Sequence, residues 1–322
     1  MRKFLNRSGL LILCVWLFTI TSYATRMLIP VGEIVGLEIG DNTVTVAAFD
    51  ENFGDAAQKA GVKVGDKILE VNGQTIRTSE DVRSALSRSD GMVEITVMRN
   101  KKTAKLRIAP AITQDGPKLG VYLKQGVSGV GTVTWYDPDS KAFGALGHGV
   151  NNPRGELLKM VSGKAYNAAV LSVRKGACGN PGQLMGALKD AQPIGTLSKN
   201  TPQGIFGIAS SGWEGEPLPV AEASEIKAGP AIIRSTVEGN TVREYSVEIL
   251  KVYPNAGSSG RNLLLHVTDE ALLCATGGIV QGMSGSPIIQ DGKLIGAVTH
   301  VLVNDPTTGY GIFIENMLDA AA

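Results

Sequence analysis

A serine between two glycines is the strongest candidate for chemistry in this sequence. It lies in the run Gly282-Met283-Ser284-Gly285-Ser286-Pro287. A nucleophilic serine needs an exposed hydroxyl and nearby backbone amides aimed at the developing oxyanion, and flanking glycines permit the tight turn that supplies both. We therefore predict Ser284 as a nucleophile, with the amides of Gly282 and Ser284 as oxyanion donors. The alternative is a small-residue turn without chemistry.

A nucleophilic serine of this kind needs a histidine within hydrogen-bond reach, and the chain has three. His148 lies between Gly147 and Gly149, which leave its ring unshielded, and it is the predicted general base. His266 lies in an apolar run typical of a strand and is expected to be structural. His300 lies on the strand that follows the serine hairpin, where it would line a substrate pocket.

The third catalytic group, an acid that orients the imidazole, is harder to choose. Asp269 precedes Ser284 closely in the chain, and Asp137, Asp139 and Asp190 are alternatives. Triad partners meet in space and not in sequence, so spacing does not decide among the four.

The composition disfavours a nucleic-acid-binding protein and favours a mainly β fold. The 322 residues include 31 Lys and Arg against 30 Asp and Glu, a balance that disfavours a nucleic-acid binder. Forty glycines and few aromatic residues favour a mainly β protein with many turns. Cys178 and Cys274 could pair in an exported protein or remain two buried thiols. Neither has metal-ligand spacing to a histidine, so we expect no metal and no cofactor.

Residues 1–26 are predicted to be a signal peptide or membrane anchor. Arg2, Lys3 and Arg7 precede an uncharged apolar stretch, which a small-residue cleavage site follows. The apolar stretch is short for a spanning helix, which needs about 20 residues. Either way, the rest of the chain is expected to be exported.

A small module is predicted over residues 30–112. Its signals are a capped helix over 79–87 and a hairpin that pairs 93–98 with 103–108. The run from Ala60 to Gly73 resembles the signature of PDZ domains, which bind peptides by adding them to a sheet edge. The loop for the peptide's terminal carboxylate is predicted at Ile34, Val35, Gly36 and Leu37, with Gly36 as a mere turn residue being the alternative.

The remaining residues, 116–322, are predicted to form a peptidase domain of short strands. An Asp291-Gly292 turn joins 287–290 to 293–301, and Glu238-Gly239-Asn240 joins another hairpin. The serine motif resembles that of chymotrypsin-like peptidases, with Met283 in place of their aspartate. The fold expected is therefore a PDZ-like module followed by a chymotrypsin-like double β-barrel.

The whole chain resembles the stage IV sporulation protein B peptidases of endospore-forming bacteria. The segments that carry the resemblance are 144–149, 277–287 and 296–301. The resemblance implies a triad of His148, Asp269 and Ser284, and export to the forespore membrane or to the space between the forespore and mother-cell membranes. It also implies cleavage of the protein itself and of a membrane-bound regulator, so that an intramembrane protease matures a mother-cell sigma factor.

Two other functions are compatible with the sequence. One is a quality-control protease of the HtrA type, although those enzymes carry the peptidase before the PDZ domain. The other is a non-catalytic PDZ scaffold, which the serine motif and His148 disfavour. The expected partners are a peptide or protein substrate and a peptide ligand of the PDZ-like module, for which the chain's own N-terminal region is a candidate.

Overall fold

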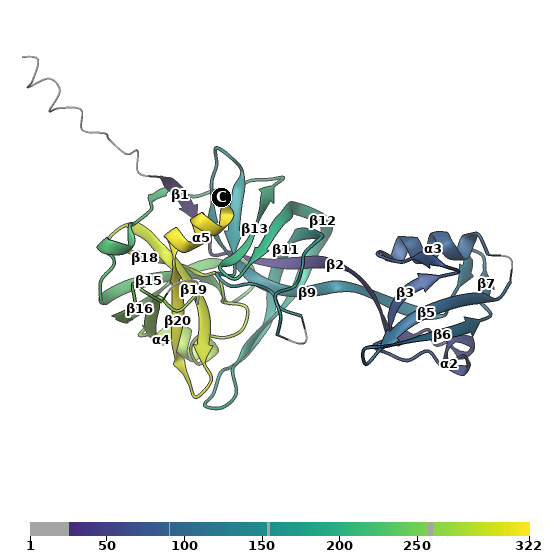
Figure 1. Ribbon diagram of the computed structural model, residues 1–322. Coiled ribbons are helices and arrows are strands. Elements are labelled where there is room, and N and C mark those ends of the chain that lie inside the picture. The colour runs from purple at the N-terminus through teal and green to yellow at the C-terminus, as the bar shows by residue number, and fades with distance from the viewer. Residues whose placement is uncertain (1–25, 90, 153–154, 257–259) are drawn as a thin grey trace, which may run out of the picture.

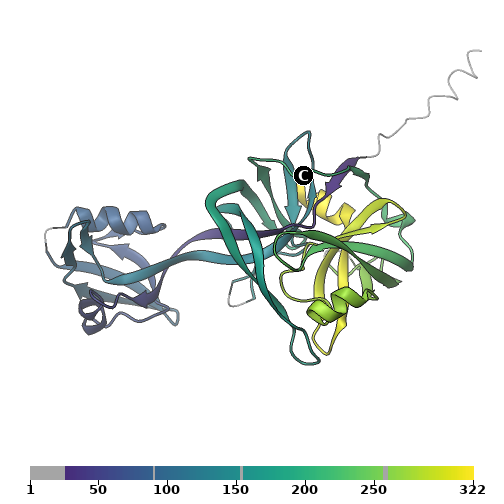
Figure 2. The same ribbon diagram turned by 180° about the vertical axis from the view of Figure 1, so that it is seen from behind.

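Three β-rich units make up the structure, a computed structural model that describes residues 26–89, 91–152, 155–256 and 260–322. Two β-barrels pack against each other, and a smaller module stands apart from them (Figure 1). The long strands β2 (Ile34–Phe49) and β9 (Val121–Tyr136) run from the barrels into the module, as the view from behind also shows (Figure 2). The predicted targeting segment, residues 1–26, lies almost wholly outside the described residues.

The first barrel is closed by the pairing of β2 with β9. Buried apolar side chains such as Val35, Phe143 and Ile205 fill its interior. Its other strands, in order from β9, are β10 (Ala142–Ala145), β13 (Gly204–Ala209), β12 (Gln183–Thr201) and β11 (Ser162–Arg174), while β1 (Met27–Pro30) and β14 (Leu218–Pro219) extend the sheet beyond β9.

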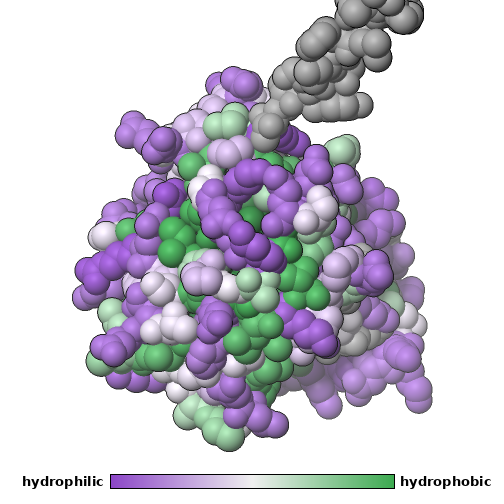
Figure 3. All heavy atoms as spheres, turned by 90° about the vertical axis from the view of Figure 1, so that its left-hand side faces the viewer, coloured by the Kyte–Doolittle hydropathy of each residue, from purple (hydrophilic) through white to green (hydrophobic). Residues whose placement is uncertain are grey.

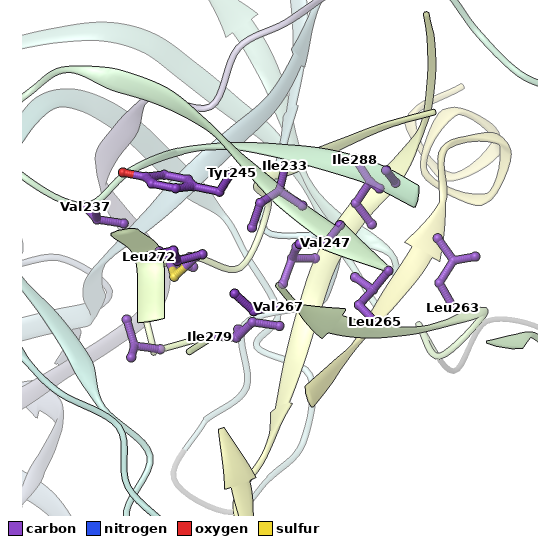
Figure 4. Close-up of a cluster of buried hydrophobic side chains, with 14 of the residues drawn as sticks. Ile233, Val237, Tyr245, Val247, Leu263, Leu265, Val267, Leu272, Ile279 and Ile288 are labelled. Carbon is purple, nitrogen blue, oxygen red and sulfur yellow. The ribbon is translucent and has the colours of Figure 1, made fainter. Parts of the chain in front are cut away.

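The second barrel has a core of branched aliphatic side chains, including Ile233, Val247 and Leu265 (Figure 4). On the face of this barrel turned away from the module, apolar side chains lie among hydrophilic ones (Figure 3). The barrel runs β15 (Gly229–Thr236), β16 (Val242–Val252), β17 (Leu263–Val267), β20 (Asp305–Phe313), β19 (Lys293–Leu302) and β18 (Pro287–Gln290), with the helices η1 (Ala223–Glu225), α4 (Glu270–Thr276) and α5 (Ile314–Ala321) around it.

The PDZ-like module is built on a sheet whose order is β9-β2-β3-β5-β6. Its core includes Val44, Ile68, Val82 and Ile95. The elements are the second half of β2, α2 (Asp55–Lys59), β3 (Lys67–Val71), β4 (Gln74–Thr75), α3 (Ser79–Ser87), β5 (Val93–Arg99), β6 (Lys102–Ile108), the hairpin of β7 (Ala111–Thr113) and β8 (Gly116–Lys118), and the first part of β9.

The mainly β fold with a PDZ-like module and a double barrel is confirmed. The Asp291-Gly292 turn joins β18 to β19, and the Glu238–Asn240 turn joins β15 to β16. Helix α3 begins after Thr78, whose side chain accepts a hydrogen bond from the amide of Asp81 in a capping box. Each of these elements carries its own local stop or turn signal.

The peptide-binding loop predicted at Ile34, Val35, Gly36 and Leu37 is wrong. These residues form the start of β2 inside the first barrel, where Ile34, Val35 and Leu37 are buried. One edge of this segment pairs with β9 and the other with β11, so its amides are already committed to strand pairing. The module and the peptidase region therefore share two long strands. Strand β2 begins in the first barrel and ends in the module, whereas β9 begins in the module and ends in the first barrel.

The cysteines match neither arrangement expected for them. Cys178 and Cys274 are free, and both are exposed. In the part of the chain that the structure describes, no helix is long and apolar enough to cross a membrane.

Candidate active site

The serine turn lies where the two barrels meet. Thr132, on β9 of the first barrel, donates its amide to the carbonyl of Ser284 at 3.0 Å and its hydroxyl to the carbonyl of Gly282 at 2.8 Å. From the second barrel, the carbonyl of Val298 accepts the amide of Gly285 at 2.8 Å. Gly285 has a φ of +98°, and a side chain there would collide with the carbonyl of Thr132. Both barrels therefore hold the turn.

Two amides of this turn are available for an oxyanion. Within the described residues, neither the amide of Gly282 nor that of Ser284 donates a hydrogen bond, whereas the amides of Met283, Gly285 and Ser286 are all paired. Gly282 and Ser284 also line the same pocket. Two unpaired amides, one of the nucleophile itself and one two residues before it, are what stabilisation of a tetrahedral intermediate requires.

The hydroxyl of Ser284 donates to the carbonyl of Thr299 on β19, at 2.8 Å. It is therefore not directed to an imidazole in this conformation. Ser286, two residues on, is fully buried and donates to the hydroxyl of Ser235 at 3.0 Å. Of the two serines in the motif, only Ser284 opens into the pocket.

His148 follows β10 and lines the same pocket, whose volume is about 440 Å³. Its Nδ1 lies 2.9 Å from the carbonyl of Gly149. A carbonyl only accepts, so Nδ1 carries the proton and Nε2 keeps the lone pair that a general base needs. Burial holds the pKa of His148 below its ordinary 6.5, so the ring is neutral at pH 7. The structure thus brings Ser284 and His148 into one pocket.

The other two histidines have separate environments. His300, on β19, lines the pocket, and its ring centroid lies 5.3 Å from that of His148. His266, on β17, lies away from the pocket, and its Nδ1 is 3.4 Å from the hydroxyl of Thr308.

Asp269 is not brought to His148. It is the N-cap of α4, where its carboxylate accepts the amide of Leu272 at 2.9 Å and the amide of Ser246 at 3.3 Å. Asp269 does not line the pocket, and among the described residues no carboxylate raises the pKa of His148 against the lowering effect of burial. A helix N-cap is a structural use of aspartate, and it explains the residue's position without catalysis.

The alternative acids do not take its place. Asp137 pairs with Arg26 at 3.2 Å and accepts the amide of Asp139 at 3.0 Å. Asp139 and Asp190 are exposed. Within the described ranges, no group of three or more His, Cys, Asp and Glu side chains is arranged to hold a metal ion.

The free sheet edge of the module lies elsewhere than predicted. At Val121–Gln125, the start of β9 pairs with β2 on one side and lies beside α3, where the amide of Ser79 donates to Gln125 Oε1 at 3.3 Å. The residues that lead into this edge, Leu119-Gly120-Val121, repeat the pattern of a glycine between apolar residues that had suggested Gly36. A search of the sequence beyond β6 for the same pattern would have found the edge of β9.

Comparison with known families agrees with this architecture. A model described as SpoIVB peptidase S55 matches residues 115–318, and a PDZ domain model matches residues 35–109. These matches confirm the family resemblance drawn from the serine and histidine motifs.

Individual relatives share only parts of the chain. Two curated proteins named as zinc metalloproteases, from Rhizobium meliloti and Agrobacterium fabrum, are 33% and 35% identical over 101 and 100 residues. Each match covers 31% of this chain and 26% of the relative, so the chain spans about a quarter of their length.

Two solved structures are also similar to parts of the chain. A PDZ domain of an SdrC-like protein from Listeria monocytogenes is 21% identical, with a TM-score of 0.23, over 27% of this chain and 92% of that one. The Rv3671c protease of M. tuberculosis, in an inactive form, is 13% identical, with a TM-score of 0.35, over 59% of this chain and 82% of that one. Because the peptidase model spans more than half of the sequence, the chain belongs to the SpoIVB peptidase S55 family, a family of serine peptidases.

Proposed function

We propose that this chain is an endopeptidase in which Ser284 attacks the scissile carbonyl and His148 accepts its proton. The observation that carries the proposal is the pocket between the barrels, which Ser284 and His148 line together with the unpaired amides of Gly282 and Ser284. Nucleophile, base and oxyanion donors are the three parts that acyl transfer needs.

The reaction begins with a change of hydrogen bonding at the serine. The hydroxyl leaves the carbonyl of Thr299 by rotation about its Cα–Cβ bond and turns toward Nε2 of His148. As Oγ bonds to the substrate carbonyl carbon, its proton passes to Nε2, and the amides of Gly282 and Ser284 receive the oxyanion. The imidazolium then returns the proton to the leaving amine, and water hydrolyses the acyl-enzyme by the same route.

The biological role that we propose is a signalling cleavage during sporulation. The enzyme would act outside the forespore, tethered to or released from its membrane, on itself and on a membrane-bound regulator of an intramembrane protease. The family membership and the placement of a PDZ-like module before the peptidase support this role. The module would hold an extended peptide at the edge of β9 beside α3.

The proposed activity is tested by labelling with a fluorophosphonate probe and by cleavage of an unstructured protein substrate. Ser284→Ala should abolish both, leaving only the small residual rate that binding and the oxyanion donors supply. Ser286→Ala is the matched control, because its hydroxyl is buried against Ser235. It should keep its labelling and lose about 1 kcal/mol of stability. Labelling that persists in Ser284→Ala would show that the nucleophile is a different residue.

A further inference from the structure

A second groove lies on the first barrel, between the serine turn and the PDZ-like module. Strands β2 and β9 form its floor, through residues that include Gly36, Ser128 and Val130. Strand β12 forms one wall, with Met185 and Leu188. The volume of the groove is about 370 Å³, enough for a few side chains of a bound polypeptide. The proposed acyl transfer makes no use of it.

The groove adjoins the active-site pocket. Val130 lines both of them. Beside it, the start of β12 is held against the segment before the nucleophile, where the amide of Leu184 donates to the carbonyl of Gln281 at 2.8 Å. Leu184 lines the groove, and Gln281 lines the pocket. A polypeptide that binds across Ser284 can therefore extend into the groove while it stays on the protein surface.

The wall of the groove presents large apolar side chains that the described chain leaves uncovered. Leu188 is 53% exposed and Met185 is 49% exposed. Leu188 lies over Gly36, where a Cβ would collide with it, so the floor is open only because it is glycine. At the end nearer the module, the carboxylate of Glu38 accepts the hydroxyl of Tyr166 at 3.0 Å. The groove thus suits an apolar side chain and disfavours an acidic one.

Strand β9 also offers backbone groups along the groove. Thr132 directs its amide to the serine turn and its carbonyl to the amide of Leu146, away from β2. Backbone groups alternate between the two edges of a strand, so those of Val130 and Ser128 point to the same edge as those of Thr132. In the described part of the chain, β10 and β1 pair with this edge only from Val133 onward. Val130 and Ser128 therefore keep amides and carbonyls for an added strand.

Building on the proposed function, we propose that this groove is an extended subsite for the substrate and binds a large apolar side chain at a fixed distance from the scissile bond. The occupant is the substrate polypeptide, which runs as an extended chain beside β9, from the free edge of the module to Ser284. Val130 and Ser128 lie two and four residues before Thr132 on β9. Because extended chains share a rise of about 3.3 Å per residue, the apolar residue lies roughly two to four residues from the scissile bond.

The proposal is tested with variants of the groove wall. Leu188→Ser removes one apolar side chain of the wall, and Met185→Ser repeats the test with the other. Leu171→Ser is the matched control, because Leu171 is 73% exposed on β11 of the same hairpin but lines neither the groove nor the pocket. Circular dichroism and thermal unfolding establish that each variant is folded.

The substrates are β-casein, an unfolded protein, and a small ester that occupies the catalytic pocket alone. For each variant, kcat/KM for casein is divided by kcat/KM for the ester. We expect this ratio to fall roughly 5- to 10-fold in Leu188→Ser and in Met185→Ser, the effect of losing about half of a buried apolar side chain. The ratio should not change in Leu171→Ser. Equal ratios in all three variants would overturn the proposal.

A second measurement reports the position of the contact. The bonds cut in β-casein are identified by mass spectrometry and aligned on the scissile bond. The wild type should favour leucine, isoleucine, methionine or phenylalanine at one position two to four residues from that bond, and Leu188→Ser should lose this preference. A preference that persists in Leu188→Ser would refute the subsite. A wild-type protein that is neither labelled by the fluorophosphonate nor active would instead refute the peptidase function itself.

Discussion

Burial keeps both imidazoles of the pocket uncharged at neutral pH, and this has a consequence for stability. The pKa of His300 lies near 4 in the folded chain, against about 6.5 in an unfolded one. Between these values the unfolded state binds a proton that the folded state does not. Stability that is fully present above pH 6.5 is therefore lost progressively as the pH falls toward 4.

The predicted contribution of His300 is isolated by comparing two proteins. From pH 7 to pH 4, the wild type should lose about 1–2 kcal/mol more unfolding free energy than His300→Phe, after discounting for partial exposure. Urea unfolding at several pH values measures this difference, and carboxylates that titrate in both proteins cancel from it. Parallel pH profiles for the two proteins would show that His300 is already charged or exposed in the folded state.

At the scale of single residues, the sequence indicated which residues share a pocket but not how all of them are arranged. Ser284 and His148 were chosen because glycines flank both, a pattern that exposes a side chain, and the structure places both on one pocket. Asp269 was placed in the triad by family resemblance, whereas the structure shows it capping α4. The cap could have been suspected from its position just before the apolar helix of 270–276.

Among the elements, β9 is a strand of the first barrel that holds the serine turn directly. Thr132 is fully buried on this strand and gives both of its donors to the turn. Thr132→Val removes the bond to the carbonyl of Gly282 while keeping side-chain shape. We expect a loss of about 1–2 kcal/mol in stability and roughly tenfold in kcat, because the oxyanion amides become less well placed.

Thr134, two residues along the same strand, is the matched control for Thr132. It is equally buried, but its hydroxyl has no hydrogen-bond partner in the described part of the chain. Thr134→Val should therefore be neutral or slightly stabilising, with kcat unchanged. Equal effects of the two substitutions on ester hydrolysis would show that the bond to Gly282 does not position the turn.

In the module, a buried ion pair joins the start of β3 to the end of β5. The carboxylate of Asp66 is fully buried, and both of its oxygens lie 2.6 Å from guanidinium nitrogens of Arg99 on β5. It also accepts the amide of Lys63 at 2.9 Å, and these bonds keep the pKa of Asp66 low despite burial. Asp66→Ala leaves Arg99 without its partner.

We expect Asp66→Ala to destabilise the module by about 3–5 kcal/mol. Ester hydrolysis should persist, because the pocket lies wholly between the barrels. Differential scanning calorimetry should show an early transition, and limited proteolysis should remove residues near 44–120. Lys59→Ala is the control, because its pairing with Asp55 is fully exposed and should contribute little. A single unshifted transition in Asp66→Ala would contradict this account.

Local turn chemistry explains which elements could be predicted. The hairpins at Asp291-Gly292 and Glu238–Asn240 carry their own turn residues, so short windows of sequence sufficed. The error at Ile34–Leu37 has the opposite cause. Nothing local distinguishes a strand that enters a barrel between β9 and β11 from one at the edge of a module, because the distinction depends on pairings with distant residues.

At the scale of the whole molecule, β2 and β9 give the module a direct connection to the serine turn. A single strand, β9, starts at the free edge beside α3 and reaches Thr132 under the serine. The register of β2 against β9 shifts between Ile39 and Val44, at the junction of module and barrel. The pairing is thus irregular where the two units join, and we expect the junction to set the angle between them.

Gly126 makes this junction possible, and its substitution tests the idea. It has a φ of +71°, and a side chain there would collide with the carbonyl of Ile39. Gly126→Ala should cost at least 1 kcal/mol and should loosen the junction, since alanine resists that conformation. Gly129→Ala, on the same strand with open space where its Cβ would lie, should behave as wild type.

We expect Gly126→Ala to be cut faster by added protease near 38–45 and 123–128. It should also cleave protein substrate less well while hydrolysing the ester at the normal rate. Indistinguishable behaviour of the two variants in both assays would mean that the junction tolerates distortion and does not orient the module for catalysis.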